Sequence, residues 1–194
     1  PPTRIDVVRD TYETYPITLW NNVKILGSGK PAVVVTPRGN SAYHGGGFMY
    51  VGAPVSLSAG VGNQLVYDVE ISGVKLVASA ITGSGVGTEL LKISAPKWDN
   101  ALYAANKQPY ASAKGLLFRD IEFLIADGSG YAAGSGLSAV RVLIENGGGG
   151  FTSGYMSNAM FDHLSLEPSA YDSGGASTWL FTDYGIHFSG TLVA

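Results

Sequence analysis

The sequence predicts an all-β fold in which short strands stack turn upon turn as a solenoid. A six-residue phrase (apolar, two variable residues, apolar, polar, apolar) recurs, strand-like runs fill much of the remainder, and glycine clusters separate those runs. The last two apolar positions alternate around a polar residue, which is the spacing of a strand with one buried face. The phrase occurs at 20–25, 71–76, 118–123 and 161–166.

The spacing of the phrases favours a solenoid over a β-sandwich. Their central apolar residues, Val23, Val74, Ile121 and Leu164, are 51, 47 and 43 residues apart. A repeat of this length indicates that each turn buries its apolar side on the next turn. A sandwich also contains many short strands, but it gives no reason for one phrase to return.

Apolar and β-branched runs predict the individual strands in order along the chain. The run 32–36 is continuously apolar, as in a strand buried on both faces. By contrast, Pro109 and a weak apolar face make 98–114 a loop rather than a helix. The expected strands are 17–19, 23–26, 32–36, 48–51, 66–71, 74–78, 90–93, 116–125, 139–144, 160–166, 179–181 and 186–188.

Each period also holds a second strand. We expect these second strands to be equivalent in successive turns, at 33–35, 90–91, 140–142 and 186–188. The chain has 27 glycines, and clusters such as 45–47 and 147–150 fall between strands. Glycine supplies the positive φ of sharp turns, so the solenoid is expected to carry Gly-rich decorated turns.

Composition limits the class of protein. The 194 residues suffice for one domain, 1–194, and 14% charged against 45% apolar residues argues against disorder or a coiled coil. A net charge of −3 offers no basic surface for nucleic acid, and no apolar run approaches the roughly 20 residues that span a bilayer. There are no cysteines, which excludes disulfides and thiolate metal sites. We expect no cofactor, no nucleic-acid partner and no membrane insertion.

Neither end of the chain has the features of a cap. It opens on Pro1-Pro2 and closes on strand-like residues at 191–194. Because a solenoid needs capping elements over its terminal strands, we expect this sequence to be a fragment of a longer chain.

The stretch 17–29, Ile-Thr-Leu-Trp-Asn-Asn-Val-Lys-Ile-Leu-Gly-Ser-Gly, resembles the opening Ile-x-Leu-x-x-x-Val-x-Ile-x-Gly-x-Gly of pectate-lyase-like, right-handed single-stranded parallel β-helices. The preceding 1–5 is a degraded form of that family's Pro-Pro-Gly-Thr-Tyr segment, and the later phrases are similar to its turns. The family includes pectin lyases, polygalacturonases and bacteriophage tailspikes and tail fibres. Low charge, Gly-rich turns and the absence of a visible leader are most like a tailspike.

That resemblance implies a homotrimer on the virion tail, outside the cell, which contacts other virion proteins and binds bacterial surface polysaccharide. It also implies hydrolase or lyase activity as an open alternative. A non-catalytic trimeric appendage and a secreted pectate-lyase-like or polygalacturonase-like enzyme are the other two hypotheses. No Asp-rich calcium pattern is evident, so that subfamily's catalytic residues are not carried over.

Aligned phrases predict columns of side chains, because stacked strands repeat about every 4.8 Å. The outward polar column reads Lys24, Lys75, Glu122 and Ser165. Lys75 should therefore lie over Glu122, either as an ordinary surface ion pair or as part of a site.

The variable pairs of the phrase supply the candidate catalytic residues. Asp120 should lie over His163, and Arg119 over Asp162. Two carboxylates on adjacent turns can meet the spacing of a glycosidase, with His163 tuning or replacing one of them. The alternative is simple turn chemistry, since Asn, Asp, Ser and Gly favour bends. Other carboxylates near turns are Glu145, Glu167, Asp172 and Asp183.

Candidate substrate-binding residues are Trp98, Tyr103 and Tyr110, together with Glu122. Aromatic faces stack on sugar rings while polar groups bond hydroxyls. The alternative is a loop packed on the solenoid or on a neighbouring subunit, because aromatic residues are also enriched in interfaces.

Overall fold

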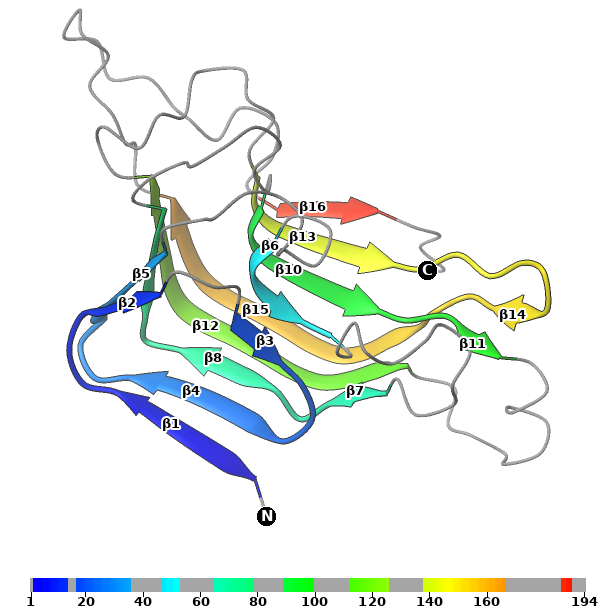
Figure 1. Ribbon diagram of the computed structural model, residues 1–194, viewed down its shortest axis with the longest axis horizontal. Coiled ribbons are helices and arrows are strands. Elements are labelled where there is room, and N and C mark those ends of the chain that lie inside the picture. Colours follow the sequence, from blue (N-terminus) through cyan, green and yellow to red (C-terminus); the bar gives the residue numbers. More distant parts are fainter. Residues whose placement is uncertain are drawn as a thin grey trace, which may run out of the picture.

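The structure is a computed structural model, and its described part consists only of strands, turns and extended segments. Two parallel sheets contain almost all of these strands, as the sequence predicts. Figure 1 shows the strands of each sheet lying side by side. The described residues are 2–13, 17–35, 47–52, 65–78, 89–99, 112–125, 138–166 and 186–189.

The first sheet is nine-stranded and curls into a nearly closed, barrel-like shape. Its strand order begins at β1 and ends at β2, which are consecutive in the chain. The path is β1 (Thr3–Val7), β4 (Val23–Gly27), β8 (Glu70–Ser72), β12 (Ala113–Ile125), β9 (Lys75–Ala78), β5 (Ala32–Val35) and β2 (Thr11–Glu13), with β15 (Met156–Leu166) and β7 (Val66–Tyr67) also paired to β12.

The second sheet has five parallel strands and faces the first across the core. A short antiparallel pair, β11 with β14, lies apart from both sheets. The second sheet runs β16 (Ile186–Ser189), β13 (Ser138–Ile144), β10 (Glu89–Ala95), β6 (Gly47–Val51) and β3 (Ile17–Leu19); the pair is β11 (Trp98–Asp99) and β14 (Phe151–Thr152).

The last three phrases stack in the predicted register. Ile71 pairs with Phe118, which pairs with Phe161. Lys75 pairs with Glu122, and Glu122 pairs with Ser165. The predicted column of outward polar residues is therefore correct from the second phrase onward.

The first phrase is shifted, and its predicted alignment is wrong. Ile25 pairs with Ile71, and Lys24 pairs with Glu70 rather than lying in the column of Lys75. Lys24 and Glu70 are 46 residues apart in the chain, whereas the first two phrases are 51 residues apart. Ala32, after an inserted turn, is the true neighbour of Lys75.

The predicted set of second strands also needs one correction. Strands β10, β13 and β16 pair as expected, with Leu91 opposite Val140 and Val140 opposite Ile186. The run 33–35 instead belongs to the first sheet, between β2 and β9. Its place beside β10 is taken by β6. The expected strand 179–181 lies outside the described residues, and β1, β2, β11 and β14 were not predicted.

Two columns of left-handed residues bend the stacked strands. Strand pairing places Asn22, Asp68, Gly115 and Asn158 in the first bend column, with φ between 52° and 65°. Gly73, Asp120 and His163 form the second bend column, with φ of 67°, 52° and 49°. Glycine, Asn, Asp and His are the residues that adopt this conformation most readily. The prediction that the variable pair marks a bend is confirmed.

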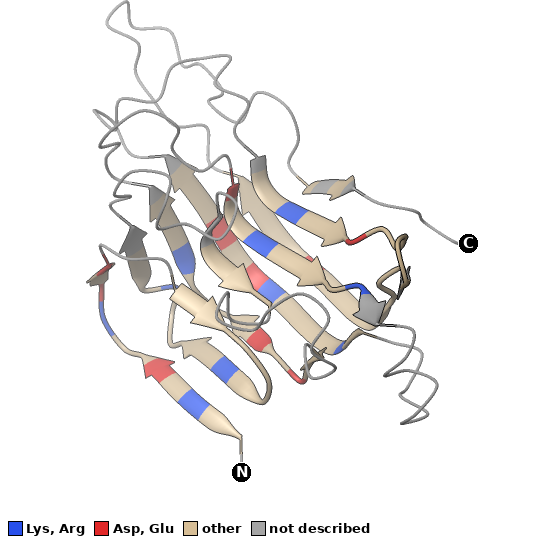
Figure 2. Cartoon of the chain, turned by 45° about the vertical axis from the view of Figure 1, so that its right-hand side comes forward, with Lys and Arg blue, Asp and Glu red and all other residues tan. Residues whose placement is uncertain are grey.

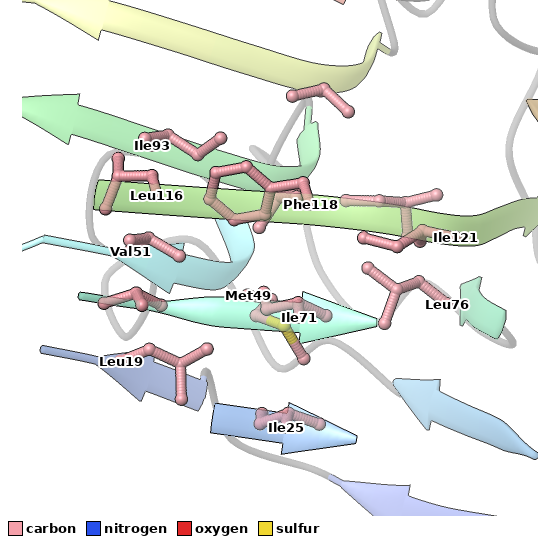
Figure 3. Close-up of a cluster of buried hydrophobic side chains, with 14 of the residues drawn as sticks. Leu19, Ile25, Met49, Val51, Ile71, Leu76, Ile93, Leu116, Phe118 and Ile121 are labelled. Carbon is pink, nitrogen blue, oxygen red and sulfur yellow. The ribbon is translucent and has the colours of Figure 1, made fainter. Parts of the chain in front are cut away.

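The core lies between the two sheets and is apolar. Residues at equivalent positions of successive strands point inward together (Figure 3). Phe118 and Phe161 stack with ring centroids 5.2 Å apart, which continues the column into β15. Fully buried members include Met49, Ile71, Leu76, Leu91, Ile93, Leu116, Phe118, Ile121 and Phe123.

Candidate functional site

The second bend column brings the three predicted catalytic residues together. Arg119 of β12 pairs with Asp162 of β15, so the following residues, Asp120 and His163, occupy equivalent bends. The His163 Nδ1 lies 3.0 Å from Asp162 Oδ1 and 3.8 Å from Asp120 Oδ1. We call Asp120, Asp162 and His163 the bend cluster.

The bend cluster is open to solvent. The exposed side-chain fractions of His163, Asp120 and Asp162 are 75%, 52% and 38%. A catalytic carboxylic acid is usually held protonated by a dry apolar environment, which this cluster lacks. Its accessible oxygens and ring nitrogens are instead suited to hydrogen bonds with a polar ligand.

Glu122 lies on the segment of β12 that follows the second bend. Its Oε1 lies 2.9 Å from the Lys75 Nζ, and its Oε2 lies 3.8 Å from the Lys30 Nζ. Two ammonium groups therefore lie beside its carboxylate.

The predicted aromatic residues fall largely outside the described part of the chain. Tyr103 and Tyr110 lie outside the described residues. Trp98 begins β11, where its backbone pairs with Thr152 of β14. The predicted loop at 98–114 thus starts with a short strand, and its last two residues already belong to β12.

A groove that the sequence did not reveal runs along the first bend column. It has a volume of about 370 Å³ and crosses the neighbouring strands β4, β8 and β12. Within it the Lys24 Nζ lies 2.9 Å from Glu70 Oε2. Figure 2 shows charged residues of both signs side by side on these strands. The groove is lined by Pro2, Asn22, Lys24, Asp68, Val69, Glu70, Gly115 and Leu117.

The outward face of the second sheet carries a buried charged cluster, also unpredicted. Tyr50, Lys92 and Arg141 occupy one register position on β6, β10 and β13. The Arg141 NH1 donates to Glu89 Oε1 at 2.9 Å, and the Glu89 side chain is only 2% exposed. Among the described residues, Glu89 Oε2 and Arg141 Nε lack a hydrogen-bond partner.

Burial changes the proton affinity of two members of this cluster. Removal from water lowers the pKa of Lys92, which the nearby Glu89 opposes. Burial raises the pKa of Tyr50, and the Glu145 carboxylate adds to that rise, while a hydrogen bond with Ser94 opposes it. Ser94 Oγ in turn donates to Glu145 Oε1 at 3.2 Å.

One sequence signal could have indicated this cluster. Lys92 and Arg141 each interrupt a run of large apolar residues in a predicted strand. Because such strands are buried on both faces, a cation within them must be buried and paired.

The described residues contain neither a group of side chains placed to hold a metal ion nor a helix that could span a membrane. No group of three or more His, Cys, Asp or Glu side chains is placed to hold a metal ion there. In the same part of the chain, no helix is long and apolar enough to cross a membrane.

Comparison of the chain with family models, with curated proteins and with solved structures gave no match. Its function must therefore be argued from its own residues.

Proposed function

We propose that the chain is a right-handed, single-stranded parallel β-helix. In-register pairing of strands more than 40 residues apart in the chain, such as Phe118 of β12 with Phe161 of β15, supports a winding chain. Two bend columns that recur on successive strands support repeated turns. Right-handedness follows from the strong preference of parallel crossover connections for that hand.

We further propose that this solenoid is a tailspike or tail-fibre component that binds bacterial surface polysaccharide. The observation that carries the proposal is the exposed bend cluster on adjacent strands β12 and β15. Carboxylates and an imidazole repeated at the strand spacing suit a ligand rich in hydroxyl groups. A homotrimer on the virion surface is part of the same proposal.

Binding without hydrolysis fits the bend cluster better than catalysis. The cluster is too exposed to hold a general acid in a dry environment. In this proposal Asp120, Asp162 and His163 contact sugar hydroxyls, and any polymer cleavage would require other residues.

The test uses capsule and lipopolysaccharide preparations from a panel of bacteria. Wild-type protein should bind at least one of them, and the Asp120→Asn/Asp162→Asn double variant should bind at least about tenfold more weakly, because Asn keeps an acceptor oxygen but removes the charge that strengthens each hydrogen bond. Asp6→Asn, at an exposed pair with Arg4, is the matched control and should bind normally.

Reducing-end release is measured in parallel. Release that disappears in the double variant would contradict the non-catalytic proposal and restore Asp120 and Asp162 as catalytic residues. Absence of binding across the panel would contradict the polysaccharide function.

A structural appendage is the second candidate, favoured by exposed apolar side chains at the edges of the strand stack. Val8 and Tyr12 are exposed beside β1 and on β2, and Met160 and Phe188 are exposed on β15 and β16. Association of copies through these surfaces would bury them. Analytical ultracentrifugation showing a trimer without glycan binding would favour this candidate.

A further inference from the structure

We propose that the groove along the first bend column binds one uncharged sugar ring. This site is separate from the bend cluster, and the choice of a sugar rests on the proposed polysaccharide function. Asn22, Asp68 and Gly115, three successive members of the column, line it on β4, β8 and β12 or at their ends.

The groove has the size and the shape of a small binding site. Its volume of about 370 Å³ falls within the range of small-molecule sites. Gly115, with φ of 65°, leaves room for the Asp68 side chain: a Cβ at position 115 would lie 2.5 Å from Asp68 Oδ1. The carboxylate of Asp68 thus occupies space that any other residue at 115 would fill.

The two carboxylates of the groove differ in their partners. Glu70 is engaged by Lys24 at 2.9 Å and by Arg119 at 3.7 Å. The carboxylate of Asp68 has no hydrogen-bond or ion-pair partner within the described ranges. Asp68 is therefore available to accept hydrogen bonds from a ligand.

The chemistry of the lining selects a hydroxyl-rich ligand without negative charge. Asp68 and Glu70 accept hydrogen bonds and repel anions, while Lys24 can only donate. A hydroxyl both donates and accepts, so neighbouring ring hydroxyls match this mixture. Pro2 and Leu117 add apolar surface for the C–H face of the ring.

The experiment compares two pairs of variants by ligand-observed NMR with methyl hexosides and the corresponding methyl hexuronides. Asp68→Asn removes the charge but keeps a residue suited to positive φ. Gly115→Ala places a methyl group against the Asp68 carboxylate, which must then shift. The matched controls are Asp6→Asn, at an exposed pair with Arg4 outside the groove, and Gly149→Ala, where φ is 59° and no atom lies within 4 Å of the added methyl group.

We expect a neutral hexoside to bind wild-type protein at least about tenfold more tightly than its hexuronide, because the Asp68 carboxylate repels the carboxylate of the hexuronide. Asp68→Asn and Gly115→Ala should each weaken that binding at least about tenfold, and the two controls should bind within about twofold of wild type. If thermal melting reveals that Gly115→Ala does not fold, Asp68→Asn alone tests whether the groove binds the hexoside.

Failure of this inference is distinct from failure of the proposed function. Unchanged hexoside and polysaccharide binding in Asp68→Asn, with loss in the bend-cluster variants, would overturn the groove and keep the function. Hexoside binding that depends on Asp68, without binding to any bacterial polysaccharide, would keep the groove and overturn the function. No binding of either ligand by wild type would overturn both.

Discussion

Glu89 supplies the carboxylate that pairs with Arg141 in the buried charged cluster of the second sheet. Its side chain is 2% exposed and bonded to Arg141, and Lys92 lies nearby in the same sheet. Breaking a buried ion pair by neutralising one partner leaves an uncompensated charge, which typically costs about 3–5 kcal/mol.

We therefore expect Glu89→Gln to lower the free energy of unfolding by about 2–4 kcal/mol, somewhat less than a fully buried pair because Arg141 is 32% exposed. Urea denaturation measures the change. Asp6→Asn, which breaks an exposed pair with Arg4, should change stability by less than about 1 kcal/mol. Equal effects of the two variants would contradict the burial of Glu89.

Lys92 makes stability depend on pH at alkaline values. Burial lowers its folded-state pKa below its usual value of 10.5, so the unfolded chain holds the proton to higher pH. Stability therefore rises with pH between the folded pKa and 10.5. Tyr50 acts in the opposite sense above pH 10.0, because its raised pKa keeps the folded state protonated while the unfolded chain ionises.

Replacement of Lys92 by Met should remove the rising part of this profile. Urea midpoints of both proteins, measured from about pH 7 to pH 10, should show wild type gaining stability relative to the variant as pH increases. Parallel curves would mean that Lys92 titrates alike in the folded and unfolded chain, contrary to its burial.

At the scale of the elements, the bends decide how adjacent strands meet. Gly73, in the second bend column, faces Gly27 so closely that a Cβ on Gly73 would lie 2.6 Å from the Gly27 carbonyl oxygen. Both glycines are needed for the backbones of β4 and β8 to approach at this bend.

Gly73→Ala should therefore destabilise the protein more than Gly149→Ala does. Both substitutions carry the same penalty for positive φ, but Gly149 has open space around it. We expect the difference in unfolding free energy to be about 1–3 kcal/mol, the usual cost of overpacking. Similar thermal melts for the two variants would contradict the close approach of the strands.

The bends also explain which elements the sequence could predict. The sequence predicts the register of the last three phrases correctly because Gly73, Asp120 and His163 mark the same bend. It misplaces the first phrase because Asn22 belongs to the other bend column. Both columns demand positive φ and so select similar residues, and a pattern of residue types cannot tell one from the other.

At the scale of the whole molecule, the predicted part of the site follows from strand stacking alone. Asp120, Asp162 and His163 meet because adjacent phrases pair in register. The groove and the buried cluster could not be predicted in this way. The groove depends on the shifted register of β4, and the buried charged cluster depends on the burial of β10 along its whole length.

Engineered cysteines test the parallel order of β9, β12 and β15 cleanly, because the chain has no cysteine of its own. Glu122 pairs with both Lys75 and Ser165. Neighbouring strands lie about 4.8 Å apart, which is within the Cα–Cα range of a disulfide. Strands two places apart are about twice as far from each other, which is too far for a disulfide.

The decisive measurement is disulfide formation under mild oxidation, read by mass spectrometry of the unreduced protein. Glu122→Cys/Ser165→Cys should cross-link within one chain, and Lys75→Cys/Ser165→Cys should stay reduced. Cross-linking of the second pair in preference to the first would contradict the stacked parallel arrangement.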